Sequence, residues 1–237
     1  MKERPMNYKQ IDIVFALRED IDPYELRYVL RSIDKNFPHR KVWFICGQPK
    51  GLKPDGAIKH KQTGNSKWAL IRSSMWEALE NEEISDPFFW FNDDFFVMKP
   101  VKGKFTNFVD GNLEDRMNEL HRDLGMTPYC RTLFKVQQEL RKQRKPELNF
   151  EVHLPMLIEK AGMRLALKNI SSPQMRSAYG NYCELETVQH KDMKVYDLES
   201  VPEDADYLST NDETFRNGKV GEFIRQTFDK PSRFEVD

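Results

Sequence analysis

The segment FWFNDDFFVMK, residues 89–99, places three polar side chains inside a run of aromatic and apolar residues: Asn92, Asp93 and Asp94. Adjacent carboxylates are costly to bury unless a partner neutralises them. Carboxylate and amide oxygens are the hard ligands that Mg²⁺ and Mn²⁺ prefer. Such an ion binds the two phosphates of a nucleotide-sugar and offsets the charge on the leaving diphosphate. The segment therefore predicts a site for a metal ion and a diphosphate.

The direction of these side chains depends on whether a strand continues through them. In an extended strand, Asn92 and Asp94 point to one face and Asp93 to the other, which favours Asn92 and Asp94 as metal ligands. The alternative is a turn between two strands, because Asn and Asp both favour turns. The apolar runs FFWF and FFVM on the two sides argue against a plain surface turn.

Two further side chains have the chemistry of an active site. His153, in NFEVHLPM, precedes a predicted helix start and could accept a proton or add a nitrogen ligand to a metal ion. A capping or hydrogen-bonded structural histidine is the alternative. Arg176 lies among turn residues and aromatics, and its guanidinium fork suits a diphosphate. A surface arginine paired with a nearby acid is the other interpretation.

Three more residues complete the candidate site. Asp212, in YLSTNDETF, could be a site acid, although it could equally be the N-cap of a final helix over residues 213–227. Arg27 and Arg31 lie one turn apart on the first predicted helix, where they could contact a phosphate. A solvated helix face is the simpler interpretation of this spacing.

The elements that must position these residues follow a regular order in the first part of the chain. Strands are predicted at IDIVFAL (11–17), at KVWFIC (41–46) and at FFWF, which ends at Asn92. Helices are predicted from the Asp22 cap to Phe37 and from Ser66 to Asn81. Strands and helices that alternate in this way are typical of a parallel α/β sheet, which binds ligands beyond the carboxyl ends of its strands.

The rest of the chain is more helical. Residues 102–145 are predicted to be polar and helical, and they end with the basic tract LRKQRK. This tract is either a solvated helix end or a phosphate-binding face. A short helix is predicted over 153–162 and a strand over MRLALKNI, residues 163–170. We expect residues 1–101 to form a nucleotide-sugar-binding core and residues 102–237 to complete the active site on the acceptor side. The two segments are expected to pack as one globular unit.

Composition narrows the function classes. The chain has 237 residues and a net charge of −1, whereas proteins whose main task is to grip nucleic acid are usually more basic. No apolar run approaches the roughly 20 residues that span a bilayer. The cysteines, Cys46, Cys130 and Cys183, are odd in number and scattered, which favours a reduced, cytoplasmic setting. Walker A, GxGxxG, GxSxG and HExxH motifs do not occur.

Four segments, in order, resemble the Stealth family of sugar-phosphate transferases, whose nucleotide-sugar-binding core is related to GT-A glycosyltransferases. The family's opening strand and helix are similar to IDIVFAL and ELRYVLRSIDKNFP, and its most distinctive motif to FFWFNDDFFVMKP. Its His-x-Pro segment is similar to VHLPMLIEK, and its terminal Asn-Asp segment weakly to LSTNDETF. The opening strand departs from the family's Trp-Val-Asp-Gly, because Ala-Leu-Arg-Glu stands there instead, at residues 16–19.

The resemblance implies a GT-A-like, Rossmann-like fold, with a mostly parallel sheet flanked by helices. It implies that Asp93 and Asp94 are catalytic or metal-holding acids, that His153 is the catalytic histidine and that Asp212 is a further site acid. Arg176 would contact phosphate.

We therefore expect a metal-assisted glycosyltransferase that uses a nucleotide-diphosphate-sugar donor and Mn²⁺ or Mg²⁺. The acceptor is left open among a glycan, a protein and a modified DNA base. Sugar-1-phosphate transfer at the same site and a non-catalytic binding module with the same fold are the alternatives.

Overall fold

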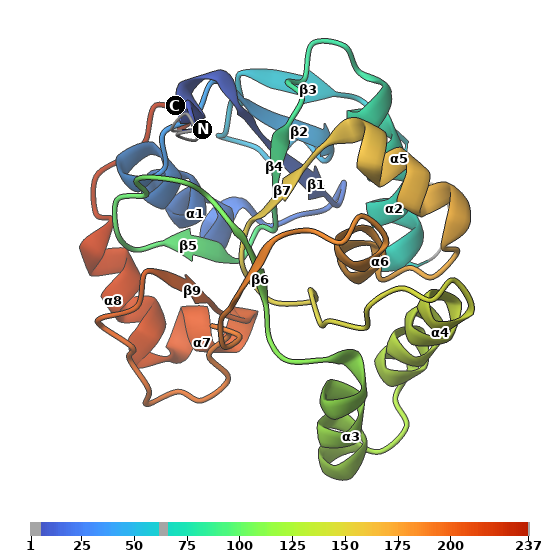
Figure 1. Cartoon of the computed structure of the whole chain (residues 1–237). Helices are drawn as coiled ribbons and strands as arrows, with labels where there is room; N and C mark the ends of the chain where they lie inside the picture. The colour runs from blue at the N-terminus through green and yellow to red at the C-terminus, as the bar shows by residue number, and fades with distance from the viewer. Residues whose placement is uncertain (1–5, 62–65, 237) are drawn as a thin grey trace.

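The computed structural model describes residues 6–61 and 66–236 and has a five-stranded sheet at its centre (Figure 1). The strand order is β3-β2-β1-β4-β7. The strands are β1 (Asp12–Leu17), β2 (Val42–Cys46), β3 (Gly56–Ile58), β4 (Phe88–Phe91) and β7 (Met156–Ile158). The first four run parallel to one another, and β7 runs antiparallel to β4. The predicted α/β class, with a mostly parallel sheet flanked by helices, is confirmed.

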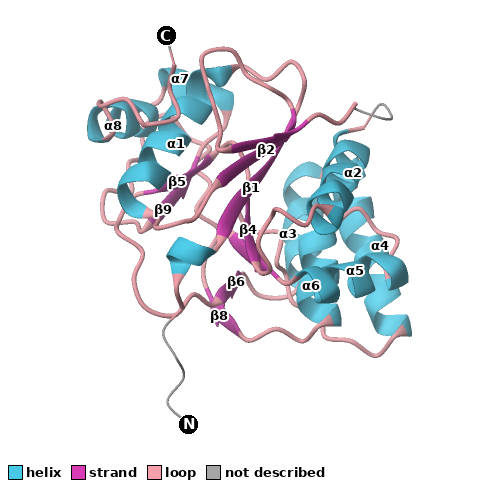
Figure 2. Cartoon of the chain, turned by 90° about the horizontal axis from the view of Figure 1, so that it is seen from above, coloured by secondary structure: helices cyan, strands magenta, loops and turns pink. Residues whose placement is uncertain are grey.

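Helices cover both faces of this sheet (Figure 2). One side carries α1 (Pro23–Asn36), α7 (Asp212–Asn217) and α8 (Lys219–Thr227); the other carries α2 (Lys67–Glu80), α5 (Lys160–Asn169) and α6 (Met175–Tyr182). Because side chains alternate along a strand, Phe89 and Phe91 belong to the hydrophobic cluster on the α1 side. Phe88 and Trp90 belong to the cluster on the α2 side. The aromatic strand β4 is therefore buried from both sides.

The remaining elements lie outside the central sheet. They are the 3₁₀ turn Tyr8–Gln10, β5 (Phe95–Val97), β6 (Asn107–Val109), α3 (Leu113–Leu124), α4 (Pro128–Lys142), β8 (Thr187–Gln189) and β9 (Tyr207–Ser209). β5 pairs antiparallel with β9, with Phe95 opposite Ser209. This pairing brings the chain after Ser209, including Asp212, next to the residues that precede Phe95.

The starts of the first two helices are confirmed. The Asp22 carboxylate accepts a hydrogen bond from the Tyr24 backbone N–H at 2.9 Å, and Pro23 is the first helical residue, where its missing N–H needs no partner. Ser66 caps α2 through the Ala69 backbone N–H at 3.2 Å. Local capping chemistry is therefore sufficient to place both helices.

The predictions for residues 153–170 are wrong. The segment predicted as a helix contains strand β7, because Met156, Leu157 and Ile158 pair with the edge of β4. The segment predicted as a strand is helix α5, whose buried residues Met163, Ala166 and Leu167 follow at helical spacing. Gly162 lies inside α5 rather than after a helix end. A Cβ there would come within 3.0 Å of Tyr179 and of Cys183 Sγ, so glycine allows α5 to approach α6 closely.

The final helix is also different from its prediction. α7 and α8 are separate helices that meet at Gly218. The N-cap of α7 is Asn211, which forms a capping box with Thr214, and Asp212 is the first helical residue. The alternative role of Asp212 as an N-cap is therefore wrong.

The two segments of the chain share their core. The second segment supplies β7 to the central sheet, and one hydrophobic cluster contains Tyr8 and Phe15 together with Ile224 and Phe234. The boundary at residue 101 stays a prediction. Within residues 6–61 and 66–236, no helix is both long and apolar enough to cross a membrane.

Candidate functional site

The residues Asn92, Asp93 and Asp94 form the connection between β4 and β5. The strand ends at Phe91, and the two aspartates lie in a turn. The strand therefore does not continue through them: the alternative of a turn between two strands is confirmed, and the shared face that an extended strand would give Asn92 and Asp94 does not form. Asn92 lines one cavity, whereas Asp93 and Asp94 line another.

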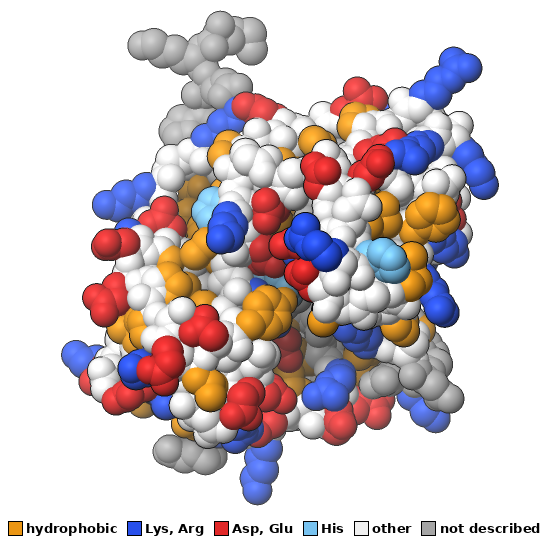
Figure 3. Space-filling model, turned by 90° about the horizontal axis from the view of Figure 1, so that it is seen from below, with side chains coloured by type: hydrophobic (Ala, Val, Ile, Leu, Met, Phe, Trp, Pro, Cys, Tyr) orange, Lys and Arg blue, Asp and Glu red, His pale blue; other side chains and the backbone are white. Residues whose placement is uncertain are grey.

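The cavity of the two aspartates, which we name the acidic pocket, has a volume of about 460 Å³. Its lining residues come from the start of α1, the β4–β5 turn, the segment before β9 and the start of α7: Glu25, Asp93, Asp94, Lys194, Thr210, Asn211, Asp212 and Glu213. Acidic side chains gather around the central hollow of the face shown in Figure 3. Of the predicted site acids, Asp93, Asp94 and Asp212 are thus brought to one pocket.

Burial and mutual repulsion act on these acids. Burial, together with the neighbouring Asp94 carboxylate, raises the pKa of Asp93 to about 6. Burial raises the pKa of Glu25 to about 8, and the charges of Asp94 and Asp93 add to this increase, although a hydrogen bond from the Thr210 hydroxyl opposes it. At neutral pH the Glu25 carboxyl is therefore largely protonated and adds little negative charge to the pocket.

Asp94 is the most constrained acid of the pocket. Its Oδ2 accepts a hydrogen bond from Lys194 Nζ at 2.7 Å, and its Oδ1 is buried without a hydrogen-bond partner among the described residues. A buried oxygen of this kind is an open coordination position for a cation. Mg²⁺ and Mn²⁺ are often held by one or two carboxylates together with substrate phosphates. Asp93 and Asp94 fit a divalent ion of this type.

The predicted ligand set of Asn92, Asp94 and His153 is not assembled in one cavity. Asn92 and His153 line a cavity of about 380 Å³, and Asp94 does not. In the part of the chain that the structure describes, no group of three or more His, Cys, Asp or Glu side chains could hold a metal ion. Any ion at Asp94 would therefore take most of its ligands from substrate and water.

His153 lies in this second cavity with an acidic partner. Its Nδ1 is 2.9 Å from Asp192 Oδ2, and Asp192 Oδ1 accepts the His153 backbone N–H at 3.0 Å. Although burial opposes it, the hydrogen bond from His153 holds the pKa of Asp192 below its usual range. With Nδ1 donating to Asp192, Nε2 is the nitrogen that can accept a proton. This is the arrangement of a general base and its orienting acid.

Arg176 is buried beside His153. Its guanidinium donates to the Leu154 carbonyl and lies 5.6 Å from the centre of the Phe95 ring, whose centre is 6.1 Å from that of the His153 ring. Its Nε is buried and unpartnered among the described residues. Burial lowers the pKa of Arg176, and the charge of Glu151 opposes this. Because Phe95 directly follows Asp94, His153 and Arg176 lie at the same carboxyl edge of the sheet as the aspartates.

The same cavity carries an aromatic wall that the sequence did not indicate. Its lining side chains include Trp68 from α2, Trp90 from β4, Tyr129 from α4 and Tyr196. Flat rings beside a basic imidazole can pack against a sugar ring or a nucleobase. We name this cavity the aromatic cavity.

The structure does not place Arg27 and Arg31 at either cavity. Arg31 donates to both carboxylate oxygens of Glu235 at 2.8 Å and to the Phe228 carbonyl at 3.0 Å. Arg27 is 3.7 Å from Glu235. Their guanidinium groups hold the C-terminal segment against α1, which gives them a structural role, and their predicted contact with substrate stays a prediction.

This structural role can be tested by measuring the free energy of unfolding of arginine variants. Replacing Arg31 by alanine is expected to lower the free energy of unfolding by about 2–3 kcal/mol, since it leaves the half-buried Glu235 carboxylate without its main partner. Arg27→Ala, on the same helix, should cost less than about 1 kcal/mol because its contact is longer and more exposed. Urea unfolding monitored by circular dichroism measures both changes. If Arg31→Ala unfolded like the wild type but lost affinity for a ligand, the original prediction would stand.

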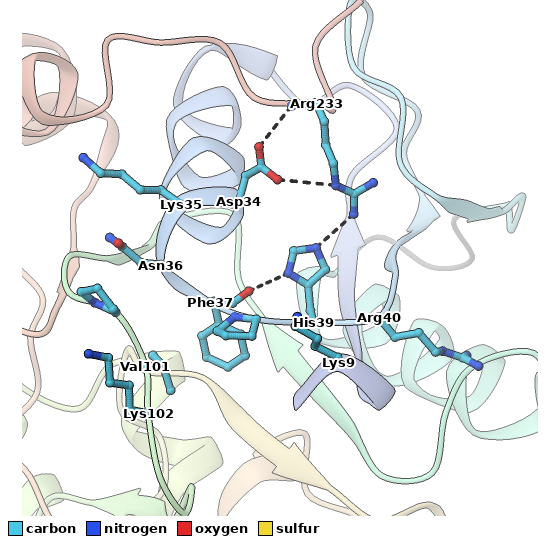
Figure 4. Close-up of a pocket in the computed structure, with 12 residues that line it drawn as sticks. Lys9, Asp34, Lys35, Asn36, Phe37, His39, Arg40, Val101, Lys102 and Arg233 are labelled. Carbon is cyan, nitrogen blue, oxygen red and sulfur yellow. Dashed lines mark hydrogen bonds and ion pairs between the residues drawn. The ribbon is translucent and has the colours of Figure 1, made fainter. Parts of the chain in front are cut away.

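Other charged groups are neutralised locally. Two basic residues of the LRKQRK tract pair with acids: Arg141 with Glu114 and Glu147, and Lys145 with Glu184. This favours its interpretation as a solvated helix end. A cavity of about 540 Å³ lies near the amino end of β1, and there Arg233 bridges Asp34 and His39 (Figure 4). It lies at the opposite edge from the one where parallel sheets bind ligands.

No protein-family model matches this chain, and no curated protein matches it. The geometry of the acidic pocket and the aromatic cavity is therefore the basis for a function.

Proposed function

We propose that this chain is a glycosyltransferase that moves a sugar from a nucleotide-diphosphate-sugar donor to an acceptor hydroxyl. The observation that carries the proposal is the position of the acidic pocket. It lies at the carboxyl end of β4 in a mostly parallel sheet, and Phe95, which directly follows Asp94, packs against the ring of His153 in the His153–Asp192 pair. Ligands bind at this edge in open α/β sheets, and a mostly parallel sheet flanked by helices supports the GT-A-like fold that we propose.

The chain's own residues suggest a division of tasks. A divalent ion, Mn²⁺ or Mg²⁺, held by Asp94 and Asp93 would offset the charge of the leaving diphosphate. His153 Nε2 takes the proton of the acceptor hydroxyl, and Asp192 stabilises the imidazolium that results. Aromatic side chains of the aromatic cavity hold the acceptor against His153 and exclude water. Asp212, which lines the same pocket, adds to the negative field around the ion.

The buried Arg176 guanidinium favours a second candidate, sugar-1-phosphate transfer. In this reaction the acceptor oxygen attacks phosphorus, and a cation beside His153 stabilises the negative charge that develops on the phosphoryl oxygens. The two reactions differ in their products. Glycosyl transfer releases a nucleoside diphosphate, whereas phosphoryl transfer releases a nucleoside monophosphate, and chromatography of the nucleotide product separates them.

A thermal-shift screen tests the donor. We expect a nucleotide-sugar at about 100 times its dissociation constant, together with Mn²⁺, to stabilise the protein by about 2.7 kcal/mol, which raises Tm by roughly 5 °C or more. Addition of EDTA should abolish this increase, and the nucleotide-sugar or Mn²⁺ alone should produce less of it. A panel of nucleotide-sugars that leaves Tm unchanged in every combination would contradict the proposal.

A further inference from the structure

Lys194 is the basic residue of the acidic pocket, and its backbone is fixed by the β5–β9 ribbon. Lys194 forms a parallel β-bridge with Ser209, the residue that pairs on its other side with Phe95. The Val195 backbone N–H donates to the Ser209 carbonyl at 2.8 Å. Lys194 and the Asp94–Phe95 segment thus flank the same residue of β9. This arrangement holds the backbone of Lys194 close enough to Asp94 for the two side chains to form an ion pair.

The ammonium group occupies the position that a cation would take. Nζ lies 2.7 Å from Asp94 Oδ2, and the Lys194 and Asp94 side chains are 14% and 18% exposed. Solvent therefore screens this pair less than it screens a surface ion pair. The other oxygen of the same carboxylate, Oδ1, is buried and lacks a partner among the described residues. Asp94 thus has one oxygen satisfied by an internal cation and one that still lacks a ligand.

We propose that Lys194 is an internal counter-cation that competes with a divalent metal ion for Asp94. While Nζ is bonded to Oδ2, a second positive charge enters the pocket against repulsion, so the free protein binds the ion weakly. The part of the proposal that concerns the diphosphate of the sugar donor rests on the proposed function. A diphosphate offers Nζ an alternative anionic partner, and the four-carbon stem of lysine allows the ammonium to move to it. The metal ion and the diphosphate then bind cooperatively.

Titration calorimetry with Mn²⁺ alone tests the competition. We expect Lys194→Met to bind Mn²⁺ at least tenfold more tightly than the wild type, because the competing charge is removed and Asp94 is left unpaired. Lys219→Met is the matched control. It also removes one positive charge, but from an exposed pair with Glu199, and should bind Mn²⁺ as the wild type does. The double variant Lys194→Met/Asp94→Asn should lose this increase in Mn²⁺ affinity.

Folding is checked by circular dichroism before each titration. If Lys194→Met does not fold, Lys194→Gln removes the charge but keeps a hydrogen-bond donor, and the same tenfold gain is expected. An Mn²⁺ affinity no tighter than that of the wild type, or no binding by either protein, would overturn the proposal. Because these titrations contain no nucleotide, their outcome is separate from the donor screen. The protein could fail that screen and still show the effect of Lys194.

Discussion

Replacing Asp94 by asparagine is expected to lower donor turnover by about 10³-fold or more. One carboxylate oxygen of Asp94 is buried without a partner among the described residues, and the other accepts a hydrogen bond from Lys194. Loss of its charge would remove the main ligand of the ion that offsets the leaving diphosphate, an effect of several kcal/mol, and each 1.36 kcal/mol corresponds to about tenfold in rate. Initial rates of nucleotide release, measured with the donor that gives the largest thermal shift, provide the test.

Asp206→Asn is a suitable control for the Asp94 variant. Asp206 directly precedes β9 and forms an exposed ion pair with Lys99, so its loss removes a carboxylate from the same ribbon without touching the pocket. We expect its turnover to stay within about twofold of the wild type, because exposed pairs contribute little. Undiminished turnover of every accepted donor by Asp94→Asn would remove Asp94 from the reaction. A chain that binds a donor but does not turn it over would instead favour the binding module.

Local sequence patterns were sufficient for the first part of the fold. β1, α1, β2, α2 and β4 were predicted because their apolar residues have a clear period, and because Asp22 and Ser66 cap the helices that follow. The same order of elements places the end of β4 at the edge where ligands bind. The position of Asp93 and Asp94 at this edge was therefore predictable from the residues around them.

The later part of the chain depends on contacts that no local pattern contains. The three-residue strand β7 is stabilised by pairing with β4, and a short apolar run does not by itself distinguish a strand from a helix. Asp192 and Lys194 lie in a segment without periodicity, and only their contacts with His153 and Asp94 reveal them. Glu25 could have been found, since the first turn of α1 follows the carboxyl end of β1.

Arg31 shows the opposite limitation. Its helical spacing with Arg27 was correct, but its partner, Glu235, lies near the other end of the chain. Spacing on a helix defines which face a side chain occupies, and the tertiary fold decides what covers that face. The same limitation applies to Asn92. Which cavity its side chain lines depends on the residue at which β4 ends, and not on the alternation of side chains along a strand.

Replacing His153 by glutamine is expected to lower kcat by about 10²–10⁴-fold, the range usual for loss of a general base. Asp192→Asn should lower kcat by a smaller factor, because it retains the imidazole but weakens its orientation and the stabilisation of its charged form. The donor-dependent thermal shift should persist in both variants, because the acidic pocket is unchanged. This separates loss of chemistry from loss of binding.

A histidine outside the site gives the matched control for this series. His190 is bonded to the neighbouring Lys191 carbonyl and packs on Phe108, so His190→Gln should retain wild-type kcat. If His153 acts as the base with Asp192 as its partner, their effects cannot be additive. The double variant should then be about as slow as His153→Gln alone, since Asp192 acts through the imidazole. Fully multiplicative losses would show that Asp192 serves the reaction independently of His153, and the pair would no longer be a catalytic unit.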